Sequence, residues 1–477
     1  MGTHGTVIGV DSSTQSCKVV VVDAGSGEIL SRATAPHPDG TAVDPRAWTR
    51  ALGEAWDAAG ARERTDVLGV GVCAQQHGMV ALDSAGEPVH DALLWNDGRS
   101  APQARAMLGH LGVREWVEAT GSAPVASITL TKLAWLRENE PEAADRVRRV
   151  GLPHDWLVRE LTGGAWVTDR SDASGSGWYD TARGRIREDL LQLWFGSVPE
   201  LPEVLAPEAA AGRIAPEWLP GSPQAVVSAG CGDNAGAALG LGIGRGDVVV
   251  SVGTSGTVFA HSPAPVADPT GVTSGFADAT GGFLPLLCTL NAARVMARTA
   301  DLLGVGLERF DELAASGDPD CAGLTLLPYL DGERTPHLPE ATGRWHGVTG
   351  ASMTRPNMAR SAVMAVAASL ADCLEVLRTL EVPVQRALLI GGGSRSQSLR
   401  TSLTHVLGVD LEIPSPDEYV ALGAARQACW AAQGELPRWV AGATGSTRLA
   451  AAQDDDADAH RGRYRAMRRE LERELAG

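Results

Sequence analysis

The chain has 477 residues, 44% of them hydrophobic and 21% charged, which is typical of a globular protein with two or three domains. Its net charge of −17 argues against a nucleic acid or an anionic membrane as a partner, because both bind basic surfaces. The 7 cysteines form no CxxC pair, which argues against a zinc site or a disulfide framework. The sequence has neither a signal-peptide pattern nor an apolar run of about 18 residues, so we expect a cytoplasmic protein.

The chain opens with two predicted strands, 6–11 and 18–23, followed by a third over 28–33. Successive N–H groups in the tight turn after the first strand could bind a phosphate, which makes Ser13 and Thr14 candidate contacts. A plain hairpin connection is the alternative. Asp11 ends the first strand, where a carboxylate could help to hold hydrated Mg²⁺, or could serve only as a turn residue.

A helix is predicted over 44–61 and a buried strand over 67–73, after which the chain continues as Gln75-Gln76-His77-Gly78. The run Gly69-Val70-Gly71-Val72-Cys73-Ala74 fits the glycine pattern of dinucleotide-binding turns. It lies inside a strand pattern and opens no helix, so we reject that function.

The segment Trp95-Asn96-Asp97-Gly98-Arg99 combines an aromatic face with an amide, a carboxylate and a guanidinium. Such mixtures suit sugars, because the ring covers C–H groups and the planar polar groups bind hydroxyls. A loop with a local salt bridge is the alternative. The next predicted helix, 128–137, is amphipathic and carries Lys132.

Asp233 lies in the glycine-rich turn Gly230-Cys231-Gly232-Asp233-Asn234, between a strand near Val226 and a helix of small residues that reaches Leu241. A carboxylate in such a turn faces open space, with few neighbours to block a substrate. A helix N-cap is the alternative role.

The strand–turn–strand pattern of the N-terminus returns at 248–260, around the turn Gly253-Thr254-Ser255-Gly256. This internal repeat predicts two homologous α/β domains with a boundary near 244–247. Two such turns facing one cleft would form a symmetric phosphate clamp. No Walker-type GxxxxGK[ST] motif is present.

The second half continues with predicted helices over 357–380, 398–407 and 421–432 and a strand over 386–390. Gly391-Gly392-Gly393 follows that strand and could lie against a nucleotide, although glycine clusters often serve only as turns. For the acidic and then basic tail, 454–477, we expect a solvated closing helix.

Taken together, these motifs resemble the FGGY carbohydrate kinase family, and within it the kinases that act on D-xylulose. The similarity extends from about Val7 to Ala432 and is specific as an ordered set rather than motif by motif. The matching runs are Gln76-His77-Gly78, Leu94-Trp95-Asn96-Asp97-Gly98-Arg99, Gly232-Asp233-Asn234, Ser251-Val252-Gly253-Thr254-Ser255-Gly256, Leu327-Pro328-Tyr329-Leu330-Asp331-Gly332-Glu333-Arg334-Thr335-Pro336 and Ile390-Gly391-Gly392-Gly393.

The resemblance implies two ribonuclease-H-like (actin-like ATPase) domains around a central cleft. Residues 1–245 would form the sugar-binding domain, 246–435 the nucleotide-binding domain and 436–477 a helical tail. The implied reaction is phosphorylation of the 5-hydroxyl of D-xylulose by ATP with Mg²⁺, and a homodimer is left open. Asp233 would be the general base. Sugar contacts would come from Gln76, His77, Trp95, Asp97 and Asn234, ATP contacts from Ser13, Thr14, Gly256, Thr257, Gly391, Gly392 and Gly393, and metal contacts from Asp11 and Asp233.

One departure concerns the first phosphate turn, which in the family usually contains Asp-x-Gly-Thr. Here it contains Asp11-Ser12-Ser13-Thr14, and a serine would tighten or tilt the turn if a positive φ were required.

Three alternatives stay open. The substrate could be ribulose, gluconate, glycerol or a related polyol, because sugar choice depends on contacts worth only a few kcal/mol. The protein could also be an actin-like ATPase that phosphorylates no sugar, or a sugar-sensing protein with an inactive site. Asp233 together with the segment 95–99 argues against the ATPase, and Asp233 alone argues against the sugar sensor.

Overall fold

The computed structural model describes residues 5–415, 417–439 and 445–476, and the chain forms two compact α/β units. The first unit comprises Met1–Ile243, Pro263–Leu284 and Asp417–Ala443. The second comprises Gly244–Ser262, Pro285–Pro416 and Thr444–Gly477. The first break in the chain therefore falls beside the predicted boundary near 244–247, and the α/β prediction with two domains is confirmed.

The units differ from the predicted division in one important respect. Residues 417–443, most of which we assigned to the second domain, belong to the first unit together with 263–284. The helix α14 (Tyr419–Gln433) lies in this returning segment and packs on the first sheet. Sequence patterns give the type of an element but not the sheet that it covers, which is why a division in chain order missed this return.

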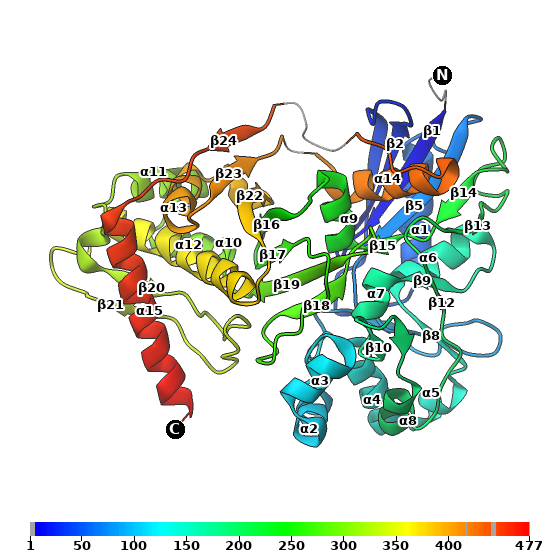
Figure 1. Ribbon diagram of the computed structural model, residues 1–477, viewed down its shortest axis with the longest axis horizontal. Helices are drawn as coiled ribbons and strands as arrows, with labels where there is room; N and C mark the ends of the chain where they lie inside the picture. Colours follow the sequence, from blue (N-terminus) through cyan, green and yellow to red (C-terminus); the bar gives the residue numbers. More distant parts are fainter. Residues whose placement is uncertain (1–4, 416, 440–444, 477) are drawn as a thin grey trace. The chain divides into compact units, whose positions relative to one another are not determined.

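The first sheet has the strand order β13-β14-β5-β1-β2-β3, and β15 also pairs with β5 (Figure 1). Strand β1 is antiparallel to β2 and parallel to β5, and β5 is parallel to both β14 and β15. The carboxyl ends of β1, β5 and β15 therefore lie at one edge of the sheet. The strands are β1 (Thr6–Ser12), β2 (Ser16–Asp23), β3 (Ile29–Pro36), β5 (Val67–Ala74), β13 (Ala210–Arg213), β14 (Val226–Ser228) and β15 (Cys231–Gly232).

The first unit also contains helices and short strands that lie outside this sheet. Helix α1 buries Trp48, Leu52 and Trp56 against the sheet core, as its apolar spacing predicted. The remaining elements are β4 (Ala42–Val43), α1 (Arg46–Ala58), β6 (Val80–Leu82), β7 (Ala92–Leu93), α2 (Ala101–Leu111), α3 (Val113–Thr120), α4 (Thr129–Asn139), α5 (Pro141–Arg146), β8 (Arg149–Gly151), α6 (Pro153–Thr162), β9 (Val167–Asp169), α7 (Arg170–Ser174), β10 (Tyr179–Asp180), β11 (Arg185–Ile186), α8 (Glu188–Phe195), β12 (Glu203–Leu205), α9 (Asp233–Leu241) and β18 (Ser274–Ala277).

The second unit repeats this plan, with strand order β19-β17-β16-β22-β23-β24. Strand β16 is antiparallel to β17 and parallel to β22, as β1 is to β2 and β5, so the predicted internal repeat is a repeat of sheet topology. Its elements are β16 (Gly246–Val252), β17 (Gly256–Ala260), β19 (Phe283–Thr289), α10 (Ala293–Leu302), α11 (Leu307–Ala315), η1 (Cys321–Gly323), β20 (Thr325–Leu327), β21 (Arg344–His346), α12 (Arg355–Thr379), β22 (Val384–Ile390), η2 (Gly392–Arg395), α13 (Gln397–Val406), β23 (Asp410–Ile413), β24 (Thr447–Leu449) and α15 (Asp455–Ala476).

The tail helix α15 is less exposed than expected. Tyr464 and Leu471 are buried on α15, and the Tyr464 hydroxyl lies 3.0 Å from that of Tyr329. Arg465 and Arg468 donate to the carboxylate of Asp372 on α12. The prediction of a solvated helix was wrong because the charge run hides an apolar stripe on one helical face. Among the described residues, no helix combines the length and the apolar character needed to cross a membrane.

Helix α14 lies directly on a glycine surface of the first sheet. A Cβ added to Gly71 would lie 2.0 Å from the carbonyl oxygen of Ala424, and one added to Gly9 would lie 1.9 Å from that of Ala421. The same helix crosses α9 closely, because a Cβ on Gly423 would lie 1.9 Å from the carbonyl oxygen of Gly236. The GxG run that we rejected as a nucleotide motif therefore allows the backbone of α14 to pack directly against β5.

We predict that Gly71→Ala destabilises the protein, because its methyl group collides with helix backbone that cannot rotate away. Overpacking of this kind costs about 2 kcal/mol or more, which lowers Tm by roughly 4 °C in a unit of this size. Gly53→Ala in α1 is the matched control. Its Cβ meets nothing within 4 Å, so replacing a mid-helix glycine should raise stability by about 0.5–1 kcal/mol. Thermal unfolding in which Gly71→Ala is as stable as the wild type, or as stable as Gly53→Ala, would contradict this account.

Candidate active site

The predicted catalytic and metal residues gather at one edge of the first sheet. Asp11 lies at the carboxyl end of β1, Gln76 follows the end of β5, and Asp233 follows β15. Because β1, β5 and β15 run parallel in register, these three side chains start from neighbouring strand ends. Open α/β sheets commonly bind their ligands at this edge.

Asp11 is 4% exposed, and its Oδ1 has no hydrogen-bond partner among the described residues. Its Oδ2 lies 3.8 Å from Nζ of Lys18. Burial raises the pKa of Asp11 to about 7; the Lys18 ammonium opposes the shift and the carboxylates of Asp233 and Glu418 add to it. A buried carboxylate with one unused oxygen and a second carboxylate nearby is suited to a cation.

Lys18 and Glu418 are site residues that the sequence analysis missed. Lys18 Nζ donates to Oε2 of Glu418 at 2.9 Å, so the residue just before α14 is tied to β2 beside Asp11. The two residues lie 400 positions apart, and no local pattern connects them.

Asp233 is the first residue of α9, and Gly232 occupies the N-cap position without a side-chain cap. The alternative role of Asp233 as an N-cap is therefore not the one it has. Its Oδ1 accepts hydrogen bonds from the backbone N and from Nδ2 of Asn234, both at 2.8 Å. Burial raises the pKa of Asp233 to about 6, against these two hydrogen bonds, so the carboxylate can exchange a proton near neutral pH.

The turn after β1 is linked to the segment 95–99. The indole Nε1 of Trp95 donates to Oγ1 of Thr14 at 2.8 Å, and the ring is 40% exposed. Ser13 donates from its backbone N to the carbonyl of Ser16 at 3.1 Å and does not have a positive φ. Serine in place of the family glycine therefore introduces no backbone strain.

Gln76 and His77 lie beside the turn that carries Asp233. Nε2 of Gln76 donates to the carbonyl of Ser171 at 3.2 Å. His77 has φ of 67°, and its ring nitrogen Nδ1 lies 3.0 Å from the carbonyl oxygen of Gly175. Its ring also packs against Phe276, with centroids 5.4 Å apart.

Asp97 is 4% exposed and forms a local salt bridge, which was the alternative that we left open for its loop. Its Oδ1 accepts from N and Nε of Arg99, and its Oδ2 accepts from Oγ1 of Thr41 at 2.8 Å. Both oxygens thus already have protein partners. This geometry favours Asp97 as a support for the loop.

The N-terminal turn of α7 is hydrogen-bonded to the turn that carries Asp233. Gly232 N donates to Oγ of Ser171 at 3.0 Å, and Ser171 Oγ donates to Oδ2 of Asp169 at 2.7 Å. Asp169 caps α7 and is buried. The sequence analysis overlooked these residues, although Thr168-Asp169-Arg170-Ser171-Asp172 has the form of a helix cap.

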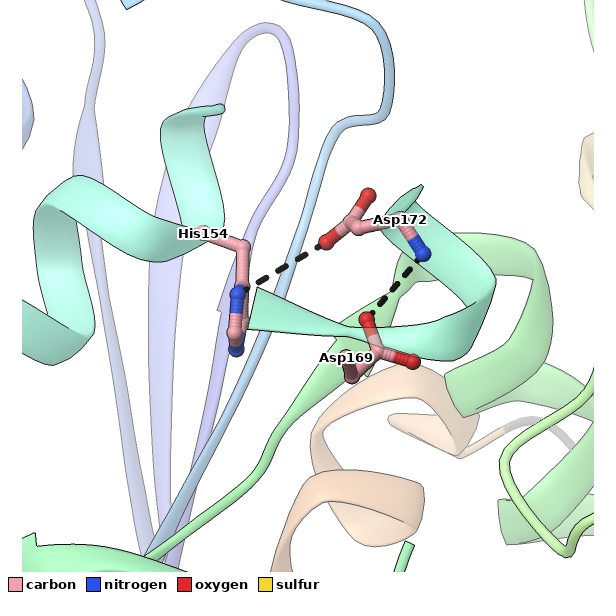
Figure 2. A group of neighbouring side chains, drawn as sticks. All are labelled: His154, Asp169 and Asp172. Carbon is pink, nitrogen blue, oxygen red and sulfur yellow. Dashed lines mark hydrogen bonds and ion pairs between the residues drawn. The ribbon is translucent and has the colours of Figure 1, made fainter. Parts of the chain in front are cut away.

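Figure 2 shows a fully buried cluster next to this cap, made of His154, Asp169 and Asp172, whose ligand atoms lie within 4.8 Å of one another. It is the group among the described residues that satisfies the spacing of a three-ligand metal site. The orientation of His154 argues against a metal. Nδ1 lies 3.1 Å from Oδ1 of Asp155, and Nε2 faces the main chain of Gly230, where a Cβ would lie 1.9 Å away.

Asp172 is the unusual member of the cluster, because neither of its oxygens accepts a hydrogen bond from any described residue. Its nearest basic atom is Nδ1 of His154, at 3.8 Å. Burial and the carboxylates of Asp169 and Asp155 raise the pKa of Asp172 well above its ordinary value. A bound proton is therefore the simplest way for this carboxyl group to be tolerated in the interior.

The second unit carries the other predicted phosphate contacts at the equivalent strand ends. Ser251 of β16 pairs with Ile390 of β22, so the turn 253–255 and the glycines 391–393 lie at the same sheet edge. Gly391 has φ of 85°, and a Cβ there would lie 2.7 Å from the carbonyl oxygen of Val252. Gly256 and Thr257 open β17 on the far side of the turn. The α13 helix begins at Gln397, after a short 3-10 turn, so the glycines do not start it directly.

Comparison with known proteins gives consistent matches over most of the chain. Residues 6–240 match the N-terminal domain of the FGGY family of carbohydrate kinases, and residues 248–432 match its C-terminal domain. The chain is 45% identical to a xylulose kinase of Streptomyces coelicolor over 436 residues, 90% of this chain and 88% of that one. It is 43% identical to a xylulose kinase of Streptomyces rubiginosus, with 91% and 90% covered.

Solved structures agree with these matches. A xylulose kinase from Bifidobacterium adolescentis superposes with a TM-score of 0.89 at 42% identity, covering 96% of this chain and 99% of that one. A Plasmodium falciparum glycerol kinase with ADP superposes with a TM-score of 0.86 at 17% identity, covering 99% of each chain, and shows the shared fold.

We predict that Asp172→Asn stabilises the protein at neutral pH, because an amide needs no proton and can donate to the neighbouring carboxylates. A carboxyl group whose pKa is raised by folding takes up a proton, so wild-type stability falls as pH rises above the ordinary carboxyl pKa. The Tm advantage of the variant should therefore grow from pH 4 to pH 8. A metal ion in the cluster would give the opposite result: the variant would be less stable at every pH, and a chelator would lower the Tm of the wild type.

Proposed function

The chain belongs to the FGGY family of carbohydrate kinases, and from that membership we propose that it transfers the γ-phosphoryl group of ATP to the 5-hydroxyl of D-xylulose. The two Streptomyces xylulose kinases, which are 45% and 43% identical to this chain, support the choice of substrate. The observation that carries the chemistry is the partly buried carboxylate of Asp233, with its pKa of about 6, at the strand edge beside Asp11.

In this proposal Asp233 takes the proton from the sugar hydroxyl while that oxygen attacks the γ-phosphorus. A base with a pKa near the working pH is ionised yet basic enough to accept the proton. Asn234 holds Oδ1 through two hydrogen bonds, which leaves Oδ2 to receive the proton. The hydrogen bond from Gly232 to Ser171 fixes the turn, so the carboxylate does not have to reorganise during the reaction.

The sugar would contact Gln76, His77, Trp95 and Asn234, with Asp97 supporting the loop. The exposed ring of Trp95 offers an apolar face for C–H groups, and its N–H is already bound by Thr14. Gln76 reaches the same turn as Asp233 through Ser171. These contacts would hold the 5-hydroxyl near the base, which is how positioning accelerates phosphoryl transfer.

Mg²⁺ is the metal that we propose for the reaction, held through Asp11 and, near the reacting oxygens, Asp233. The unpartnered Oδ1 of Asp11 fits this assignment, because Mg²⁺ takes one or two carboxylates and keeps several waters. When bound, the metal would neutralise developing charge on the phosphates. Lys18, paired with Glu418, keeps Asp11 in place without occupying its free oxygen.

The proposed phosphate contacts are Ser13 and Thr14 in the turn after β1, and Gly256 and Thr257 after the turn that follows β16. Gly391, Gly392 and Gly393 would lie against the nucleoside, because glycines 391 and 392 are exposed and offer bare backbone. A cytoplasmic location and a homodimer also remain predictions.

We expect D-xylulose to give the strongest sugar-dependent release of ADP from Mg-ATP. The panel contains D-xylulose, D- and L-ribulose, gluconate, glycerol and no sugar, followed in a coupled spectrophotometric assay. A faster rate with another member would keep the kinase and change its substrate. An ATPase rate that no sugar alters would instead favour the actin-like alternative.

For Asp233→Asn we predict a loss of turnover by about 10²-fold or more, as expected when a positioned base is removed. Sugar binding, measured by calorimetry, should persist because the amide keeps the shape of the side chain. Asp57→Asn on the exposed surface of α1 is the control and should leave turnover unchanged. Near-normal turnover of Asp233→Asn would remove Asp233 from the base role.

A further inference from the structure

The chain contains 41 basic Lys and Arg side chains, but its lysines are only Lys18 and Lys132. Lys18 lies beside Asp11. Lys132 is on α4, is 0% exposed and plays no part in the reaction described above. Burying an amine is costly, and an apolar side chain of similar length would fill the same space at lower cost. Of the two lysines, only Lys132 is fully buried.

The Lys132 amine is bonded to main-chain carbonyls of irregular segments. Nζ donates to the carbonyl oxygen of His77 at 2.8 Å and to that of Ser127. Oγ1 of Thr129, also on α4, donates to the same His77 oxygen at 3.2 Å. His77 needs this support, because a non-glycine residue at φ of 67° is strained and keeps that conformation only when its surroundings hold it there.

Helix α4 also supports the second sugar segment. Oγ1 of Thr131 lies 2.9 Å from Oγ of Ser100, directly after the segment 95–99. The guanidinium of Arg99 lies over the ring of Trp135, 4.9 Å from its centroid. Two of the three segments that contribute candidate sugar contacts, those at 76–77 and 95–99, are therefore held by α4.

Burial lowers the pKa of Lys132 to about 7, while the carboxylate of Asp97 opposes the shift. The side chain can donate to both carbonyls whether or not it carries the extra proton, since a neutral amine still has two N–H groups.

We propose that Lys132 is a positioning residue for sugar recognition, which fixes His77 through its main-chain carbonyl and so aims the imidazole at the sugar. This inference rests on the proposed function. It assigns to α4 the role of a rigid platform under the sugar site, with Lys132 as the link to His77. The nucleotide contacts involve other segments, so this role concerns the sugar alone.

The test is a kinetic cycle with Lys132→Met, His77→Ala and the double variant. Lys132→Met should raise KM for D-xylulose by about tenfold or more, since small misplacements of substrate-positioning groups are costly. KM for Mg-ATP should stay within about twofold, since the ATP contacts lie elsewhere. In the His77→Ala background, where no imidazole remains to be aimed, the same change should have little further effect on the sugar KM.

Equal increases in both KM values, or a full effect of Lys132→Met in the His77→Ala background, would overturn the proposal. If Lys132→Met does not fold, Thr129→Val removes the second bond to the same carbonyl and should raise the sugar KM selectively, by a smaller factor. An unchanged sugar KM in that variant would then count as refutation.

A readout that needs no substrate separates this inference from the proposed function. Amide hydrogen exchange of the peptide covering residues 75–80 should be faster in Lys132→Met than in the wild type. If no sugar stimulates the wild type, the proposed function fails, yet faster exchange would still support the positioning role. Unchanged exchange would overturn it.

Discussion

The contact of α14 with the glycines of β1, β5 and α9 is the constraint on which the site depends. Only hydrogen side chains at Gly9, Gly71 and Gly423 allow these backbones to approach so closely. The contact fixes α9, whose first residue is Asp233, relative to β1, which carries Asp11 near its carboxyl end. It also places Glu418, just before α14, where it can pair with Lys18. A segment far along the chain thus completes the sheet edge that carries the proposed chemistry.

Several carboxyl groups are buried near the carboxyl ends of β1, β5 and β15, and most of them have no basic side chain close enough to form a strong ion pair. Asp11, Asp169 and Asp172 all have raised pKa values, with burial as the leading cause. They serve different ends. Asp169 is the hydrogen-bonded N-cap of α7, Asp172 is best accommodated with a proton, and Asp11 keeps a free oxygen of the kind that Mg²⁺ binds. Perturbed carboxyl groups therefore mark the site without each having a catalytic role.

Much of this could be predicted from the sequence, because local patterns determine local structure. The strand–turn–strand repeat, the strand before Gly391 and the helix after Gly232 all occur within a few residues of their predicted positions. What could not be predicted depends on distant partners. Nothing near residue 18 indicates residue 418, and the Gly69–Gly71 run shows its purpose only when the helix lies on it. The segment 95–99 likewise gives no sign that Thr41, which is remote in sequence, donates to an oxygen of Asp97.

The central claim is phosphoryl transfer to a particular oxygen of a particular sugar, so the most direct measurement is the position of the phosphate in the product. The protein would be incubated with D-xylulose and Mg-ATP, and the product analysed by phosphorus–proton correlation NMR. The account predicts a single sugar phosphate in which phosphorus couples to the protons on carbon 5. Phosphate on another carbon, or ATP hydrolysed to inorganic phosphate with the sugar unchanged, would contradict it.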